Sequence, residues 1–384
     1  MILHELITYD VLRVIWWLLL GVLLVGFAVT DGFDLGAMGL LRATAKTDVE
    51  RRVAINSVGP VWEGNQVWLI LGGGAIFAAW PQLYAVSFSA FYLAMFAVLV
   101  PLILRPVAFK FRSKIDDVAW RNRWDWVLCI TGLVPSLLFG VAVGNVLLGV
   151  PFRLGDDMRI YYDGTFFGLL TPFALLAGLV SLSMILMHGA SWLVFKTEGS
   201  IADRAAKYGS VFAVLTTVLF AAAGVYLALG LNGYVITSDI NPVGPSNPLN
   251  KTAAVVAGAW MNNFMAYPVL WLVPAVGLVM PLVVAVGLRS RREWLSLLGS
   301  GLAIAGIILS VGCAMFPMIL PSTVDPRFTL TVWDSSSSHM VLFIMLVCAL
   351  IFIPLILFYT SWVYSVLRGK VDPMAIITGK GHSY

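Results

Sequence analysis

The sequence has 384 residues, of which 60% are hydrophobic and only 11% are charged. Soluble domains carry about 25% charged residues, so this composition excludes a soluble architecture and predicts an all-α polytopic membrane protein. The net charge is only +4 and the three cysteines have no CxxC spacing, so no nucleic-acid partner, disulfide framework or thiolate metal site is indicated.

Apolar runs long enough to cross a bilayer as helices, about 20 residues or more each, occur nine times along the chain. Acidic rather than basic residues precede the first run, and no small-residue cleavage site follows it, so we expect a retained span rather than a signal peptide. The predicted spans are 10–41, 58–80, 83–108, 124–149, 166–195, 208–231, 260–287, 294–320 and 340–367.

The basic residues lie mainly in the segments that follow the first, third, fifth, seventh and ninth spans. Basic loops stay on the cytoplasmic side, so this pattern predicts a multi-pass membrane protein with its N-terminus outside and its C-terminus in the cytoplasm. That orientation requires an odd number of spans, which nine satisfies. The predicted outer side holds only Arg13, Arg153, Arg159, Lys251 and Arg327.

The segments on the predicted outer side are longer than the inner ones and rich in turn-forming residues. Such loops of about 20 residues often serve function or contact a partner, and a plain cover over the helices fits them nearly as well.

A faint internal repeat connects the two halves of the chain. AKTDVERRVAINSV follows the first span, and FKTEGSIADRAAKYGSV follows the fifth. An even number of spans between two copies gives them the same orientation, although coincidence also explains so short a match. We predict one integral membrane domain, 1–384, built as two four-helix bundles of similar orientation, roughly 1–150 and 151–320, plus a ninth, peripheral helix at 340–367.

Three carboxylates, Asp31, Asp34 and Glu63, lie within the predicted spans with apolar neighbours on both sides. An ionisable group at this depth costs roughly 2.5 to 3.5 kcal/mol on insertion scales, so it needs a partner or a function. One interpretation places the acids at the headgroups, or pairs them with arginine or backbone donors that hold helices in register. The interpretation that we favour makes them part of a proton, ion or ligand path.

Polar neighbours extend this predicted path. Gln66 shares a helix face with Glu63, because the two are three residues apart in the motif WEGNQVW. Arg105 ends the third span and could pair with a carboxylate on the cytoplasmic side. The glycine run 72–74 is expected to permit close helix contact. The predicted proton path consists of Glu63, Asp31, Asp34, Asn65, Gln66 and Arg105.

The chain has no Walker A, GxSxG or HExxH motif, so it contains no recognisable catalytic centre of those classes. A haem iron needs an axial ligand from a helix face. His188 is the only histidine in the middle of a predicted span and has no second one to pair with it, so we expect a hydrogen-bonded core histidine rather than a haem ligand. We predict no catalytic residue, no metal and no directly bound cofactor in this chain.

Several motifs along the chain stand out together: DVLRVIWWLLLGVLLVGFAVTDGFDLG, RRVAINSVGPVWEGNQVWLILGGGAIFAAWP, RPVAFKFRSK, WRNRWDW, SNPLNK, MFPMILPS, LTVWDSSSS and the terminal GHSY. They resemble subunit II of the cytochrome bd quinol oxidases of bacterial membranes, which implies localisation in the inner membrane, and the resemblance covers essentially the whole chain. The segments TDGFD and WEGNQVWL are the most specific of the motifs.

The resemblance implies a complex in which subunit I carries two b-type haems and a d-type haem, oxidises quinol and reduces oxygen to water. Protons for the water come from the cytoplasm, so a proton gradient forms without pumping. Subunit II holds no haem and supports subunit I. The resemblance further implies a proton path and an oxygen route in subunit II, and in some members a bound structural quinone. Some complexes also contain a small third subunit with a single helix. The whole complex is surrounded by membrane lipid.

By the same resemblance, Glu63 is the carboxylate at which the proton path begins. Asp31, Asp34 and Arg105 stand in matching motifs as weaker candidates for the path, and the oxygen route is assigned to the region of Trp62 and Trp68. The family commonly has aspartate where this chain has Glu63. Either residue is a carboxylate, but the longer side chain moves the proton-bearing atoms by roughly one methylene.

Two other functions stay open from the residues alone. Intramembrane acids and repeats of one orientation also suit a proton-coupled secondary transporter, which would be active without a partner. An assembly scaffold that conducts no proton would tolerate neutralisation of Glu63.

Overall fold

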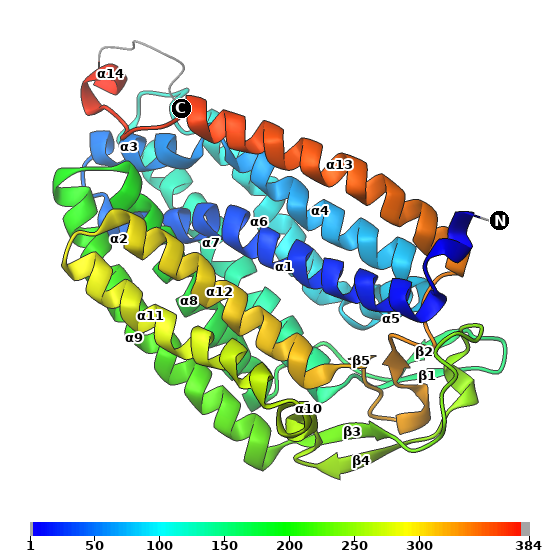
Figure 1. Cartoon of the computed structure of the whole chain (residues 1–384). Helices are drawn as coiled ribbons and strands as arrows, with labels where there is room; N and C mark the ends of the chain where they lie inside the picture. The colour runs from blue at the N-terminus through cyan, green and yellow to red at the C-terminus, as the bar shows by residue number, and fades with distance from the viewer. Residues whose placement is uncertain (1–2, 378–384) are drawn as a thin grey trace.

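A computed structural model describes residues 3–377 of the chain. The long helices lie side by side, with short strands gathered at one end of the bundle (Figure 1). The opposite end holds α2 (Leu41–Thr44), α3 (Asp48–Val58) and α14 (Pro373–Ile377). We call these the strand end and the α3 end. The terminal motif GHSY lies outside the described residues.

Eight helices of the described chain are long and apolar enough to cross a membrane. A ninth, α4 (Trp62–Ala79), has 18 residues, and its polar first turn and glycine run make it less apolar. Each predicted span contains one of these nine helices, in agreement with the predicted fold class. The eight are α1 (Tyr9–Gly39), α6 (Tyr92–Phe111), α7 (Val118–Leu148), α8 (Pro172–Lys196), α9 (Gly199–Gly230), α11 (Leu272–Arg289, extended by η5), α12 (Glu293–Met315) and α13 (His339–Val366).

The predicted third span is broken near its outer end. Helix α5 (Pro81–Ala90) stops at Phe91, and α6 begins at the next residue. The shorter helices are α2 (Leu41–Thr44), α3 (Asp48–Val58), α10 (Asn262–Ala266), α14 (Pro373–Ile377), η1 (Leu3–Leu6), η2 (Phe167–Leu169), η3 (Pro248–Asn250), η4 (Ala259–Met261), η5 (Pro268–Trp271) and η6 (Pro326–Phe328).

The turn-rich segments on the predicted outer side form three small antiparallel sheets of two strands each, which the sequence analysis did not predict. Each sheet pairs strands that are close in the chain, so these segments fold largely locally. The pairs are β1 (Phe152–Leu154) with β2 (Ile160–Tyr162), β3 (Asn232–Ile236) with β4 (Ala253–Ala257), and β5 (Met318–Leu320) with β6 (Leu330–Thr331).

Glycines let the central helices approach very closely. A Cβ atom added at Gly36 of α1 would lie 2.1 Å from the carbonyl oxygen of Ile185 on α8, and one added at Gly189 would lie 2.1 Å from the Gly36 carbonyl carbon. By contrast, a Cβ at Gly72, Gly73 or Gly74 would meet no atom within 4 Å. The expectation that the glycine run permits close contact is therefore wrong within this chain, where other glycines make the contact.

The first turns of α1 are tied to the strand-end loops through Arg13. This buried guanidinium donates hydrogen bonds to the Ser336 hydroxyl at 2.8 Å and to the carbonyl oxygens of Pro242 at 2.5 Å and Gly244 at 3.0 Å. A second buried pair, Lys251 Nζ and Asp334 Oδ2 at 2.8 Å, joins two of these loops to each other. The loops therefore form a structured cover over that end of the bundle.

Candidate functional site

A buried ion pair joins α1 to α6 inside the bundle. Arg105 Nη1 lies 2.5 Å from Asp31 Oδ1, and Nη2 lies 3.2 Å from Oδ2. The exposed fraction of the Arg105 side chain is 2% and that of Asp31 is 0%. A two-pronged guanidinium–carboxylate contact of this kind neutralises both charges where water cannot solvate them.

One turn further along α1, Asp34 has no cation of its own among the described residues. Its Oδ2 accepts a hydrogen bond of 2.8 Å from Asn65 Nδ2 on α4, and both residues are buried. Its Oδ1 is also buried and has no hydrogen-bond partner among the described residues. The two aspartates therefore differ chemically, because only Asp31 is held by an arginine.

Tyr364, near the end of α13, completes the cluster. Its hydroxyl donates a 2.8 Å hydrogen bond to Asn65 Oδ1, so the amide is held from both of its ends. The sequence analysis did not select this residue, because a tyrosine at the end of an apolar run is typical of an interfacial anchor. We call Asp31, Arg105, Asp34, Asn65 and Tyr364 the carboxylate cluster.

The two tryptophans assigned to an oxygen route are buried beside this cluster. The Trp62 ring stacks on Phe109, with centroids 5.4 Å apart, and the Arg105 guanidinium lies 5.8 Å from the Trp62 ring centre. Trp68 packs against α1 at Gly26, where an added Cβ would come within 2.9 Å of its ring. Trp62 therefore packs against α6 and Trp68 against α1, and their part in an oxygen route stays a prediction.

Glu63 does not join the carboxylate cluster through any side-chain contact. It lies in the first turn of α4 and is exposed, and among residues 3–377 it has no ion-pair partner. Two residues along a helix correspond to about 200° of rotation, so Glu63 and the inward-facing Asn65 lie on nearly opposite sides of α4. The half-buried Gln66 is likewise outside the cluster. The structure thus brings together Asp31, Asp34, Asn65 and Arg105, and leaves Glu63 and Gln66 on another face.

His188 of α8 is a hydrogen-bonded core residue, as predicted. Its Nδ1 lies 2.7 Å from the Ser300 hydroxyl of α12, and its Nε2 lies 2.8 Å from the Val29 carbonyl oxygen of α1. Both ring nitrogens are thus engaged within the protein. Within the described part of the chain, no three His, Cys, Asp or Glu side chains are grouped so that they could hold a metal ion.

The α3 end carries a second set of charges, nearer to the surface. The buried Asp125 of α7 accepts from Arg51 at 2.8 Å and from Arg112 at 2.6 Å, which links α3, α6 and α7. On the other side of α3, Glu50 receives hydrogen bonds from Ser200 and Arg204 of α9. Partial burial raises the pKa of Glu50, but these bonds and two backbone N–H groups outweigh it and lower the pKa to about 2.

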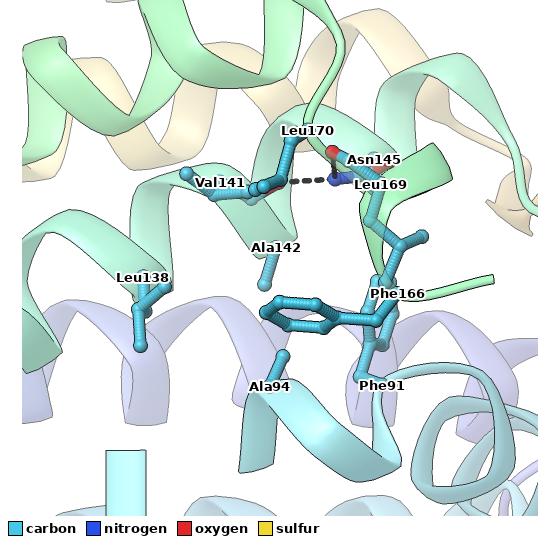
Figure 2. Close-up of a pocket in the computed structure, with 9 residues that line it drawn as sticks. All are labelled: Phe91, Ala94, Leu138, Val141, Ala142, Asn145, Phe166, Leu169 and Leu170. Carbon is cyan, nitrogen blue, oxygen red and sulfur yellow. Dashed lines mark hydrogen bonds between the residues drawn. The ribbon is translucent and has the colours of Figure 1, made fainter. Parts of the chain in front are cut away.

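Two cavities lie toward the strand end, at the last turns of α7. The smaller, about 10 Å³, has room for a single water-sized molecule (Figure 2). Figure 2 shows the Phe166 ring reaching toward Ala94 and Ala142, and Asn145 donating to the Val141 and Leu169 carbonyl oxygens. A larger pocket of about 340 Å³ adjoins it at Asn145 and Leu169. No carboxylate, histidine or cysteine lines either one, so neither carries the site's acid chemistry.

Comparison with known proteins gives consistent matches over nearly the whole chain. Residues 12–367 match the family described as cytochrome bd terminal oxidase subunit II. The chain is 49% identical over 365 residues to cytochrome bd-I ubiquinol oxidase subunit 2 of Escherichia coli (strain K12), covering 95% of this chain and 96% of that one. It is 30% identical over 361 residues to cytochrome bd ubiquinol oxidase subunit 2 of Bacillus subtilis (strain 168), covering 93% and 96%.

Among solved structures, the fold is similar to a chain of the bd oxidase from Geobacillus thermodenitrificans, with a TM-score of 0.67 and 16% sequence identity. The match covers 96% of this chain and 99% of that chain. At this identity the likeness concerns the arrangement of the helices.

Proposed function

Because the chain belongs to the family of cytochrome bd terminal oxidase subunit II, and is thus one subunit of an oxidoreductase complex in the inner membrane, we propose that it supplies a proton path for the reduction of oxygen to water. The observation that carries this proposal is the difference between Asp31 and Asp34. One buried carboxylate is neutralised by arginine, and the other, one turn away, has only a neutral amide donor and a free oxygen.

In this proposal Asp34 holds the exchangeable proton. A buried carboxylate without a cation is costly, so the group gains from taking up a proton and can release it when a better acceptor appears. Asp31 cannot serve in this way, because both of its oxygens are bound by the Arg105 guanidinium. The free Oδ1 of Asp34 is the oxygen at which the proton arrives and leaves.

Glu63 is the proposed uptake carboxylate. It begins α4 at the α3 end, where the basic residues predict the cytoplasmic side. A negative side chain is stabilised in the first turn of a helix, so its position is favourable before any partner binds. Since Glu63 faces away from Asn65, water or side chains of the partner subunit must complete the connection to the carboxylate cluster.

We further propose that the haems of the complex reside in subunit I and that this chain holds none. The engagement of both His188 nitrogens supports this, since an axial imidazole must leave one nitrogen free for iron. Quinol and oxygen react in subunit I in this scheme. A structural quinone and a small third subunit of the complex are likewise expected from the family resemblance. Among the contacts of residues 3–377, none favours the proton-coupled transporter over this function.

The test is the variant Glu63→Gln in the purified complex, reconstituted in lipid vesicles. Glutamine preserves size and polarity but cannot titrate, so a specific effect on proton uptake points to the carboxyl group. We expect quinol-driven oxygen consumption and proton uptake to fall together, roughly 10-fold or more. The matched control is Glu5→Gln, an exposed acid at the strand end, which leaves both unchanged. Full turnover in Glu63→Gln would exclude the uptake role.

A further inference from the structure

Helix α13 is anchored to the bundle at both ends: Leu342 and Leu346 are buried near its start, and its last turns contact α8. It runs along the edge of the molecule, with its end beside α14 and α3 (Figure 1). Lys196, the last residue of α8, donates from Nζ to the carbonyl oxygens of Leu367 at 2.7 Å and Gly369 at 3.1 Å. A cation at the C-terminal end of a helix satisfies free carbonyl groups and interacts favourably with the helix dipole. This contact fixes the end of α13 one turn after Tyr364.

Aromatic packing then orients the Tyr364 ring. The ring meets Trp192 of α8 edge-on, with centroids 6.2 Å apart and an interplanar angle of 88°. It also meets Phe33 of α1 at 6.4 Å and 78°. Phe33 and Trp192 are themselves stacked at 3.9 Å, so the tyrosine packs against a preformed pair of rings. Such contacts leave the phenol little freedom, and its hydroxyl is directed at Asn65.

The directions of the two hydrogen bonds at Asn65 determine which protonation form of Asp34 they favour. The Tyr364 hydroxyl donates to Asn65 Oδ1, so the Nδ2 end of the amide faces Asp34 and donates to its carboxylate. If the amide turned over, its oxygen would face Asp34 and would instead accept a hydrogen bond from the protonated carboxylic acid form. A phenol hydroxyl donates a hydrogen bond more readily than it accepts one, so the tyrosine favours the amide orientation that stabilises the ionised form of Asp34.

An amide does not pass a proton on without changing its own bonding, so Tyr364 and Asn65 are not carriers in this arrangement. From these contacts we infer that Tyr364 is a positioning residue: it holds Asn65 with its N–H toward Asp34 and so allows that carboxyl group to release its proton. The inference rests on the proposed proton path. The charged and titratable groups around Asp34 are Asp31 on α1, Arg105 on α6, Tyr364 on α13 and, beyond Phe33, His188 on α8.

The test compares Tyr364→Phe with the matched control Tyr359→Phe in the complete complex. Tyr359 lies on the same helix but is exposed, so loss of its hydroxyl is not expected to matter. Phenylalanine keeps the ring packing of Tyr364 and removes only the hydroxyl. Loss of one hydrogen bond that favours the ionised Asp34 carboxylate is expected to shift a pH midpoint by about half a pH unit to one pH unit. We expect the pH midpoint of quinol-driven oxygen consumption to move upward by that amount in Tyr364→Phe.

A double-mutant cycle separates this role from a general structural one. In an Asn65→Ala background, where the amide is already absent, Tyr364→Phe should cause no further movement of the midpoint. Infrared difference spectra give a second measurement, since the protonated carboxyl band that disappears in Asp34→Asn should persist to higher pH in Tyr364→Phe.

Two results overturn the inference while the proton path stands. One is an unchanged pH midpoint of oxygen consumption in Tyr364→Phe when Asp34→Asn abolishes turnover. The other is an equal shift of that pH midpoint by Tyr364→Phe with and without Asn65. If Asp34→Asn itself turns over normally at every pH, the proposed function fails as well.

Discussion

Arg105 of α6 binds Asp31 of α1 through two guanidinium nitrogens, and neither side chain exposes more than 2% of its surface. The pair joins two helices that are distant in the sequence at a depth where an isolated charge would be expensive. Asp34 lies one turn away and is left to the amide of Asn65. Since one arginine cannot serve both carboxylates in this way, their stability and chemistry should respond differently to substitution.

The first prediction concerns the stability of this pair. Arg105→Leu leaves Asp31 buried without its cation and is expected to cost about 3 to 5 kcal/mol, whereas the double variant Arg105→Leu/Asp31→Leu should recover much of that loss. Thermal unfolding of the detergent-purified complex, followed by size-exclusion chromatography, measures both effects. A double variant as unstable as the single one would contradict the assignment of the cost to the unpaired charge.

The second prediction concerns proton transfer. Asp34→Asn retains the shape of the side chain and its contact with Asn65, so the complex should assemble and unfold near the temperature of the unaltered protein. Proton uptake during quinol oxidation should fall by roughly 100-fold, because the titrating oxygen is gone. Uptake is followed with a pH-sensitive dye in vesicles. Normal uptake in a correctly assembled Asp34→Asn complex would rule out the carrier role.

The third prediction concerns Glu50 and pH. Its pKa in the folded protein is about 2, below the ordinary value of 4.5, so its stabilising effect is fully present above about pH 4.5 and is lost as the pH falls toward 2. Glu50→Gln should therefore be less stable than the unaltered protein at neutral pH, and the difference should shrink on acidification through that range. Unfolding temperatures at a series of pH values provide the measurement.

Glu198→Gln is the control for the Glu50 variant. The Glu198 side chain is 76% exposed and lies 3.5 Å from Lys370, so its contribution should be small at any pH. A stability difference for Glu50→Gln that stays constant on acidification would argue that packing, rather than charge, is responsible.

The fourth prediction tests the close contact of the central helices. Gly189→Ala would bring a methyl group to 2.1 Å from the backbone of Gly36, so α1 and α8 must separate, at a cost of roughly 1 to 3 kcal/mol or more. Gly224→Ala on α9, where a Cβ meets nothing within 4 Å, should be neutral or slightly stabilising. Yield and unfolding temperature of the two variants can be compared directly; equal stability would contradict the close packing.

Much of the fold could be predicted from the sequence, because each membrane-spanning helix needs a long apolar run of its own. Helix α4 was found although its polar first turn weakens that signal. The break at Phe91 was not, since the chain there stays apolar on both sides. The short strands were missed because two to five residues of turn-rich sequence carry no clear periodicity.

The carboxylate cluster was only partly predictable. The high cost of burying charge singled out Asp31, Asp34 and Arg105, but two aspartates one turn apart on the same helix are equally good candidates for one arginine. Tyr364 reaches Asn65 across 299 positions of sequence, and no local pattern marks such a contact. The exposure of Glu63 was also hidden, because an apolar membrane helix does not reveal which face it turns to its neighbours.

The location of Tyr364 on the final long helix also sets an order of events during synthesis. Helices α1, α4 and α6 leave the ribosome well before α13, so Asp34 and Asn65 are already in the membrane when Tyr364 is made. The amide gains its second anchor only after α13 has been made. A subunit truncated before α13 would carry the acids without the tyrosine that orients their amide, so the cluster is completed only by the synthesis of α13.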